Sequence, residues 1–150
     1  MDNIINVNVI DLHLEGSNKD AVMEYMADLI NQDGRLTDKE EYIKSVKERE
    51  ATFTTGIGFG VAIPHGKSDA VKVPTVAFGK CREGMDWQSV DDKPVYMVFL
   101  IAVPKQADSN QHLKILAALS RKLMHDGFRK EIAETEDKEK VCSILETILS

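Results

Sequence analysis

Cysteines, basic clusters and long apolar runs are scarce in this sequence, and each shortage narrows the possible functions. The two cysteines, Cys81 and Cys142, lie far apart and belong to no CxxC pair, so we expect reduced structural thiols and no disulfide. Lys and Arg number 19 against 25 Asp and Glu, which gives a net charge of −6 without a basic block. This balance argues against nucleic-acid binding and favours small molecules or proteins as partners.

The apolar runs are too short for the roughly 20 residues that a membrane helix needs. The start at Met1 shows neither the basic region nor the apolar core of a signal peptide. We therefore expect a cytoplasmic protein that does not insert into a membrane. The 150 residues are 43% hydrophobic and contain neither a repeat nor a linker, which predicts one domain over residues 1–150.

Near the N-terminus the pattern predicts a strand followed by a helix. Residues 9–14 alternate between apolar and polar side chains, as a half-buried strand does, with His13 on the polar face. The helix is expected from residue 18 to about residue 32. Ser17 is its expected cap, and Gly34 marks its end.

A second helix is predicted directly afterwards. Thr37 and Glu40 have the spacing of a capping box, and the helix should run to about Glu50. Its last turn, residues 47–50, is interpreted as a solvent-exposed helix end. The side chains expected to face inward are Tyr42, Ile43 and Val46.

The middle of the chain predicts two strands separated by a charged loop. Residues 72–79 form a short strand, and residues 82–93 form the loop, anchored by Trp87. Residues 95–103 are apolar on both faces, which is typical of a central strand covered by helices on each side. Pairing of this strand should stop at Pro104.

The last third predicts two helices. The first is capped by Asp108 or Ser109, runs to about His125 and is closed by Gly127; the second covers residues 136–150. The apolar side of the first helix is expected to comprise Leu113, Leu116, Leu119, Leu123 and Met124. Strands and helices mixed along the whole chain predict an α/β single-domain layer sandwich, with a mixed β-sheet flanked by helices on both faces.

A glycine-rich run ending in a histidine is the strongest functional signal. Gly56, Gly58 and Gly60 permit backbone conformations and close approaches that suit an anion. Pro64 fixes its own φ and stiffens the backbone just before His65. A histidine displayed in this way is difficult to explain as core packing.

Other chemistries fit the sequence less well. The glycine spacing matches neither the Rossmann nor the P-loop motif, and no Gly-x-Ser-x-Gly elbow indicates a hydrolase. His65, His112 and His125 form no tight ligand cluster with the cysteines, so we expect no metal and no cofactor. What remains is His65 acting as a nucleophile through a ring nitrogen, because neutral imidazole is available at cellular pH.

Two further side chains are candidates for contacts with a phosphoryl group on His65. Arg49 offers a forked set of donors for phosphate oxygens. His112 follows the central strand, at the kind of sheet edge where α/β proteins bind ligands. On spacing alone, a surface arginine and a helix-start histidine remain the alternative interpretations.

These motifs resemble the EIIA domain of the fructose/mannitol class of the bacterial phosphoenolpyruvate-dependent sugar phosphotransferase system. The resemblance covers nearly the whole chain, and its most specific part is the Gly-x-Ala-Ile-Pro-His core. It implies that His65 accepts a phosphoryl group from the carrier HPr and passes it to a cysteine of an EIIB domain. The EIIB domain then phosphorylates a sugar, with fructose expected, entering through the membrane component EIIC. The residues that carry the resemblance are Arg49-Glu50, Thr55-Gly56-Ile57-Gly58, Gly60-Val61-Ala62-Ile63-Pro64-His65 and His112-Leu113 with Leu116 and Leu119.

The resemblance also implies roles for residues around His65. His112 is expected to stabilise and help transfer the phosphoryl group, and phosphate contacts are expected from Arg49, Thr55, Gly58 and Gly60. From their placement beside His65, we further expect the apolar side chains Phe59, Val61 and Ile63 to form part of an exposed docking rim.

Two alternatives remain open. A regulatory EIIA of the nitrogen-related branch would be phosphorylated on the same histidine but would have no transport role. A non-catalytic module that uses the glycine run to bind an anion would carry no covalent phosphate.

Overall fold

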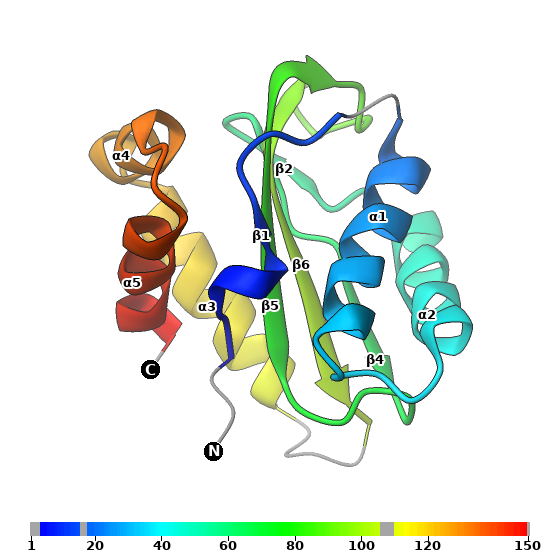
Figure 1. Cartoon of the computed structure of the whole chain (residues 1–150). Coiled ribbons are helices and arrows are strands. Elements are labelled where there is room, and N and C mark those ends of the chain that lie inside the picture. Colours follow the sequence, from blue (N-terminus) through cyan, green and yellow to red (C-terminus); the bar gives the residue numbers. More distant parts are fainter. Residues whose placement is uncertain (1–3, 16–17, 106–109, 150) are drawn as a thin grey trace.

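The structure, a computed structural model, describes residues 4–15, 18–105 and 110–149. It contains a six-stranded mixed sheet between two layers of helices (Figure 1), which confirms the predicted α/β sandwich. In chain order the elements are η1 (Val7–Val9), β1 (Ile10–Asp11), α1 (Lys19–Gln32), α2 (Lys39–Thr52), β2 (Gly56–Gly58), β3 (Val61–Ala62), β4 (His65–Ser68), β5 (Thr75–Met85), β6 (Val95–Pro104), α3 (Gln111–Leu123), α4 (Asp126–Glu134) and α5 (Lys138–Leu149).

Strand β6 organises the sheet. The strand order is β1-β5-β6-β3-β2, and β4 also pairs with β6, beyond β3. β6 is antiparallel to β5 and parallel to both β3 and β4. The central strand was therefore predicted correctly, including its end at Pro104.

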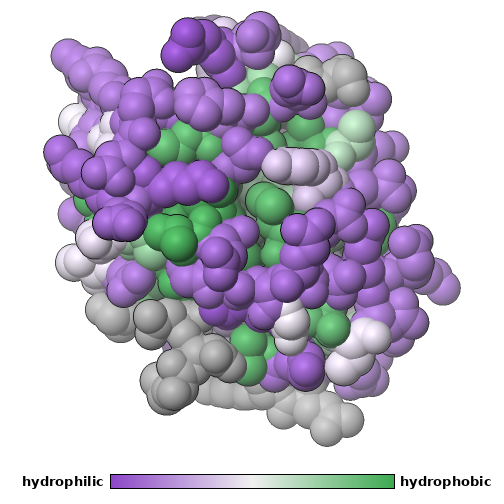
Figure 2. Space-filling view, viewed as in Figure 1, coloured by the Kyte–Doolittle hydropathy of each residue, from purple (hydrophilic) through white to green (hydrophobic). Residues whose placement is uncertain are grey.

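The helices cover both faces of this sheet (Figure 1). α1 and α2 lie on one face, and α3, α4 and α5 lie on the other. Because β6 is covered on both sides, most of its side chains are buried, and Phe99 packs on Phe78 of β5 with ring centroids 4.9 Å apart. On the outside, apolar residues appear as separate patches between hydrophilic side chains (Figure 2). No helix in the described part of the chain is long and apolar enough to cross a membrane.

The N-terminal predictions need three corrections. The expected strand over residues 9–14 is reduced to β1, because residues 7–9 form a 3-10 helix instead. The cap of α2 is Asp38, whose side chain accepts from the N–H of Glu41, so the helix starts one residue later than the Thr37 capping box predicts. The expected cap Ser17 lies outside the described residues, and Asn18 caps α1.

The second half of the chain departs from the prediction at a strand and a helix. β5 runs on to Met85 through residues that were expected in the charged loop, although Trp87 is fully buried as its predicted anchor. The region after α3 forms the separate helix α4, with Gly127 inside it and not closing the preceding helix. Leu113 and Met124 were expected on the apolar side of α3, but they are 53% and 72% exposed. The expected caps of α3, Asp108 and Ser109, lie outside the described residues.

Candidate functional site

His65 opens strand β4 and lies opposite Ile101 of the central strand. The next residue, Gly66, lets α2 pack directly on β4, because a Cβ there would lie 2.3 Å from Ser45 Oγ and 2.8 Å from Val46 Cγ2. A side chain at position 66 would therefore force strand and helix apart. The absence of one sets the distance between His65 and the C-terminal end of α2.

One ring nitrogen of His65 already has a partner. Nδ1 lies 3.1 Å from the carbonyl oxygen of Ile63. A carbonyl oxygen only accepts hydrogen bonds, so Nδ1 carries the proton in the neutral ring. The lone pair then resides on Nε2, which makes Nε2 the nucleophilic atom.

The surroundings of His65 keep its ring neutral. Burial lowers its pKa from the ordinary value, and the charges of Arg49 and His112 lower the pKa further. The hydrogen bond to Ile63 and the carboxylate of Glu50 act in the opposite direction. The net shift is downward, so the nucleophilic form persists to a lower pH than in a free histidine.

His112, from the first turn of α3, lies next to His65. The ring centroids are 6.5 Å apart and the ring planes differ by 29°. Burial and the charge of Lys67 lower the pKa of His112. Its Nδ1 is buried and has no hydrogen-bond partner among the described residues. A buried polar atom without a partner is costly.

Arg49 approaches from the last turn of α2. One of its guanidinium nitrogens, Nη1, donates to the carbonyl oxygen of Phe53 at 2.8 Å. Its charge is close enough to His65 to lower the pKa of that ring. The structure thus brings together Arg49, His65 and His112, which come from three separate elements.

Glu50 is a component of the site that sequence reasoning missed. It was interpreted as part of a solvated helix end, yet it is only 7% exposed. Its carboxylate accepts from the N–H of Thr55 at 3.0 Å and from the Thr55 hydroxyl at 2.5 Å. Lys19 lies 3.6 Å away as its cation. No local signal in the sequence marks this contact, because the C-terminal end of a helix leaves carbonyl groups without partners and creates no need for an acceptor.

Glu50 is connected to His65 through the backbone. The carbonyl oxygen of Thr55 accepts from the N–H of Ile63 at 3.0 Å, and the Ile63 carbonyl holds His65 Nδ1. The indole N–H of Trp87 donates to the Thr55 hydroxyl oxygen at 3.2 Å. These bonds fix the loop after α2 against the strand that carries the histidine. The polar groups of Thr55 are therefore already occupied, and its expected phosphate contact stays a prediction.

Gly58 and Gly60 are not brought to His65. Along β6, Val61 lies opposite Met97 whereas His65 lies opposite Ile101. Four residues of strand correspond to about 13 Å. Gly60 is instead held at the other end of β6, where its carbonyl accepts from Tyr96 and Met97. A phosphate role for these two glycines stays a prediction, and this register does not support it.

The expected docking rim needs a correction. Val61 and Ile63 are buried in the core, because β3 pairs with the central strand, so neither side chain forms an exposed surface. Phe59 is exposed, but it lies at the Gly60 end of the run. Two exposed apolar residues adjoin the candidate site instead: Leu113, which follows His112 directly, and Phe53, whose carbonyl oxygen Arg49 holds.

The described residues contain no group of three or more His, Cys, Asp or Glu side chains arranged to hold a metal ion. Cys81 and Cys142 are both buried and separate. The site thus consists of a neutral histidine nucleophile, a second histidine and an arginine. This set is suited to a phosphoryl group, because nitrogen donors surround the atom that would carry it.

A family model of the "Phosphoenolpyruvate-dependent sugar phosphotransferase system, EIIA 2" matches residues 3–148. The chain belongs to this family. EIIA components are phosphotransferases that act as phosphocarriers of a sugar phosphotransferase system. Family membership confirms the resemblance noted in the sequence.

Individual relatives agree with this assignment. The chain is 41% identical over 146 residues to a "PTS system fructose-specific EIIA component" from Haloferax volcanii, covering 97% of this chain and 94% of that protein. It is 35% identical to a "PTS system fructose-specific EIIABC component" from Bacillus subtilis, covering 95% of this chain but 22% of that protein. Among solved structures, the nitrogen regulatory protein IIA-Ntr from Neisseria meningitidis superposes with a TM-score of 0.87 at 32% identity, covering 95% of this chain and 96% of that one.

Proposed function

We propose that Nε2 of His65 accepts a phosphoryl group from phosphorylated HPr and passes it to a cysteine of an EIIB domain. The single observation that carries this proposal is the hydrogen bond from His65 Nδ1 to the Ile63 carbonyl. It leaves one nitrogen of a partly exposed, neutral ring free to attack. The fructose-specific relative supports fructose as the sugar that is finally phosphorylated.

In the first step, the Nε2 lone pair attacks phosphorus while the bond from phosphorus to the donor histidine of HPr breaks. The electron pair of that bond returns to the donor ring. The His65 ring gains positive charge as the new bond forms, and the Ile63 carbonyl, which holds Nδ1–H, stabilises this charge. In the second step, a cysteine thiolate of EIIB attacks the same phosphorus, and the electron pair returns to Nε2.

The other side chains orient the group that is transferred. Arg49 supplies positive charge for the phosphoryl oxygens, and the ring of His112 lies beside the ring of His65. Phosphoryl transfer depends mainly on positioning and charge stabilisation. A fixed nucleophile with two flanking donors meets that requirement.

An EIIB partner has support from the Bacillus subtilis relative, whose name joins components A, B and C in one protein. Contact with a membrane EIIC would then occur through EIIB. A regulatory role is the second candidate, because the Neisseria meningitidis IIA-Ntr has nearly the same fold. It has less support, since the fructose-specific relative is 41% identical and IIA-Ntr 32%.

The test is incubation with phosphoenolpyruvate, enzyme I and HPr, followed by intact mass measurement. We expect one acid-labile phosphoryl group on the natural protein and none on His65→Ala. His125→Ala is the matched control, because His125 is exposed and lies at the start of α4. Undiminished labelling of His65→Ala would contradict the assignment. Transfer to an EIIB cysteine, followed by fructose phosphorylation with EIIB and EIIC, would separate transport from regulation.

A further inference from the structure

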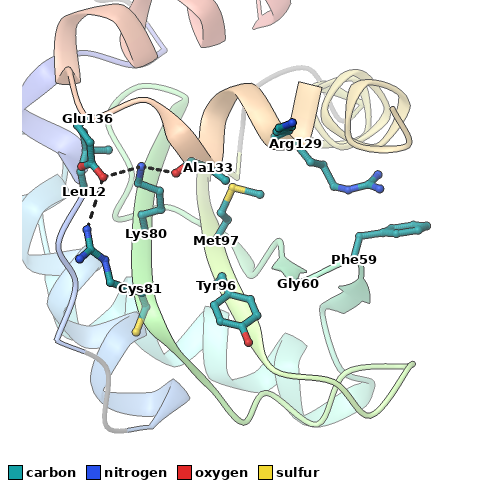
Figure 3. A pocket seen from close by; sticks show the side chains of 12 residues that line it. Leu12, Phe59, Gly60, Lys80, Cys81, Tyr96, Met97, Arg129, Ala133 and Glu136 are labelled. Atoms are coloured by element: carbon teal, nitrogen blue, oxygen red, sulfur yellow. Dashed lines mark hydrogen bonds and ion pairs between the residues drawn. The ribbon is translucent and has the colours of Figure 1, made fainter. Parts of the chain in front are cut away.

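A cavity lies at the other end of β6 from His65, between α4 and the sheet (Figure 3). Its volume is about 400 Å³. This is within the range of roughly 300–1,000 Å³ that small-molecule sites occupy. Its walls come from the turn between β2 and β3, from β5, from β6 and from α4.

The charge of this cavity is opposite to that of the whole protein. The chain carries a net charge of −6. Four cationic side chains and one acidic side chain nevertheless line the cavity: Lys80, Arg82, Arg129, Lys130 and Glu136. Another surface pocket nearby has the reverse character, with carboxylates of Glu131 and Glu134 among its lining groups. The local excess of positive charge therefore favours an anionic ligand.

Two of the cations are held in place, Lys80 mainly by carbonyl oxygens and Arg129 by one carbonyl oxygen and one carboxylate. Lys80 Nζ donates to the carbonyl oxygens of Ala133 at 2.9 Å and Thr135 at 2.7 Å, at the end of α4. Arg129 donates to the carbonyl oxygen of Leu123 and also pairs with a carboxylate of the same helix. The carbonyl groups position the ammonium of Lys80 without cancelling its charge, and the carboxylate of Glu136, 3.9 Å from Nζ, offsets part of that charge. Burial lowers the pKa of Lys80, and the negative charge of Glu136 acts against this shift.

The other two cations lie at the rim. The Arg82 side chain is 82% exposed, and its guanidinium is 3.8 Å from Glu136, too long for a strong pair. Lys130 is exposed on α4. Both side chains are free to turn toward a ligand that enters from solvent.

The cavity also has a flat apolar side. Phe59 is 59% exposed, and the Arg129 guanidinium stacks 4.2 Å from the centroid of its ring (Figure 3). Phe59 has a φ of 61°, which is uncommon for a residue with a large side chain. Backbone strain of this kind often occurs at functional sites. Tyr96 and the buried side chain of Met97 continue the apolar surface into the cavity.

We propose that this cavity binds a small organic anion with a flat apolar portion, such as an aryl or nucleoside phosphate. The flat portion lies against Tyr96 and Met97, and the anionic group faces Arg82 and Lys130. The register places this site about 13 Å along β6 from His65. The proposal stands independently of phosphoryl transfer, because binding is measured on the unphosphorylated protein.

The test uses 1-naphthyl phosphate as the probe, titrated into the natural protein and followed by amide NMR. We expect saturable binding at one site, with shifts concentrated at Gly60, Met97 and Lys130. Neutral 1-naphthol and inorganic phosphate should each bind at least fivefold more weakly, because each supplies only half of the contacts. Equal affinity for 1-naphthol, or shifts spread without saturation, would overturn the proposal.

Charge reversal at the rim tests the same site from the protein side. Arg82→Glu combined with Lys130→Glu should weaken 1-naphthyl phosphate binding at least tenfold, and both residues are exposed, so the fold should persist. Lys44→Glu combined with Lys72→Glu is the control with the same change of net charge at exposed positions elsewhere. Unchanged affinity in the rim variant contradicts the proposal. Tighter binding of a hexaglutamate peptide than of 1-naphthyl phosphate would also contradict it, and would indicate an acidic protein segment instead.

Discussion

The two ends of β6 carry sites of different construction. At the Ile101 end, His65 is fixed by hydrogen bonds that run through Ile63 and Thr55 to the buried Glu50. At the Met97 end, the cavity lies between α4 and the sheet, and Lys80 of β5 donates to a carbonyl oxygen of that helix. Covalent transfer requires one nitrogen at a fixed angle, whereas ligand binding requires space and a favourable charge.

The glycine-rich run connects these two regions. Its histidine belongs to the first, while Gly60 and the exposed Phe59 belong to the second. A single stretch of sequence thus contributes to two surfaces about 13 Å apart along a strand. The glycines shape the hairpin between β2 and β3, and the register along β6 does not bring Gly58 or Gly60 to His65.

The largest effect is expected at the first region, from His112→Ala. His65 should still be labelled, but onward transfer to EIIB should slow by about 100-fold, the usual loss for one stabilising donor. Rapid-quench measurement of transfer to the EIIB cysteine checks this, with His125→Ala as the control. Onward transfer at the natural rate would reduce His112 to a structural residue.

Arg49→Lys should have the next largest effect. Lysine keeps the charge but loses the fork that holds the Phe53 carbonyl and reaches phosphate oxygens together. We expect the rate of transfer from HPr to fall about tenfold, equivalent to about 1.4 kcal/mol. Lys47, two residues earlier on α2, provides the control as Lys47→Arg. If Arg49→Lys transferred as fast as the natural protein, a simple charge at this position would suffice.

Glu50→Gln tests whether the Glu50 carboxylate affects the titration of His65 as well as the stability of the fold. An amide leaves one of the two Thr55 donors without an acceptor, so the free energy of unfolding should fall by about 1–3 kcal/mol. The carboxylate raises the pKa of His65, so its removal should lower the His65 midpoint in an NMR titration below that of the natural protein.

In the natural protein, the titration midpoint of His65 should itself lie below the ordinary histidine value, because burial is the largest influence on its pKa and lowers it. As the pH falls, His65 is protonated in the unfolded chain before it is protonated in the folded protein. The stability that the neutral ring contributes is therefore present above the pKa of the unfolded state, and it is lost as the pH falls from that value through the pKa of the folded state. Glu48→Gln, at an exposed position on the same helix, should change neither the stability nor the midpoint. An unchanged midpoint in Glu50→Gln would show that the carboxylate acts on stability alone.

The smallest effect is expected from Gly60→Ala, which belongs to the second region. Gly60 has a φ of 76°, so alanine should lower the free energy of unfolding by about 1–2 kcal/mol. Urea denaturation measures this cost. A loss of transfer from HPr of more than tenfold, beyond what the lower stability explains, would restore the phosphate role that the sequence predicts for Gly60.

The prominence of His65 was predictable from a local signal, because Pro64 precedes it directly in a glycine-rich run. Arg49 and His112 could not be separated from a surface arginine and a helix-start histidine by their spacing, and only the family resemblance pointed to them. The burial of Glu50 could not be predicted, since a charged residue in the last turn of a helix is usually solvated. Only the tertiary contact with Thr55 and Lys19 removes it from water.

The second region could not be predicted, because its walls come from separate segments that only the fold brings together. One of them, α4, was not expected at all, because Gly127 suggested the end of a helix and not the interior of another. Register also matters: the sequence places Gly60 only five positions before His65, but an extended strand separates them widely.

The central claim is that Nε2 of His65 carries the phosphoryl group. The most direct test is NMR of the ring nitrogens in protein labelled with ¹⁵N-histidine and phosphorylated through HPr. We predict a phosphorus-coupled Nε2 on His65, with a proton retained on Nδ1, which remains bonded to the Ile63 carbonyl. A phosphoryl group on Nδ1, or on any residue other than His65, would contradict this account.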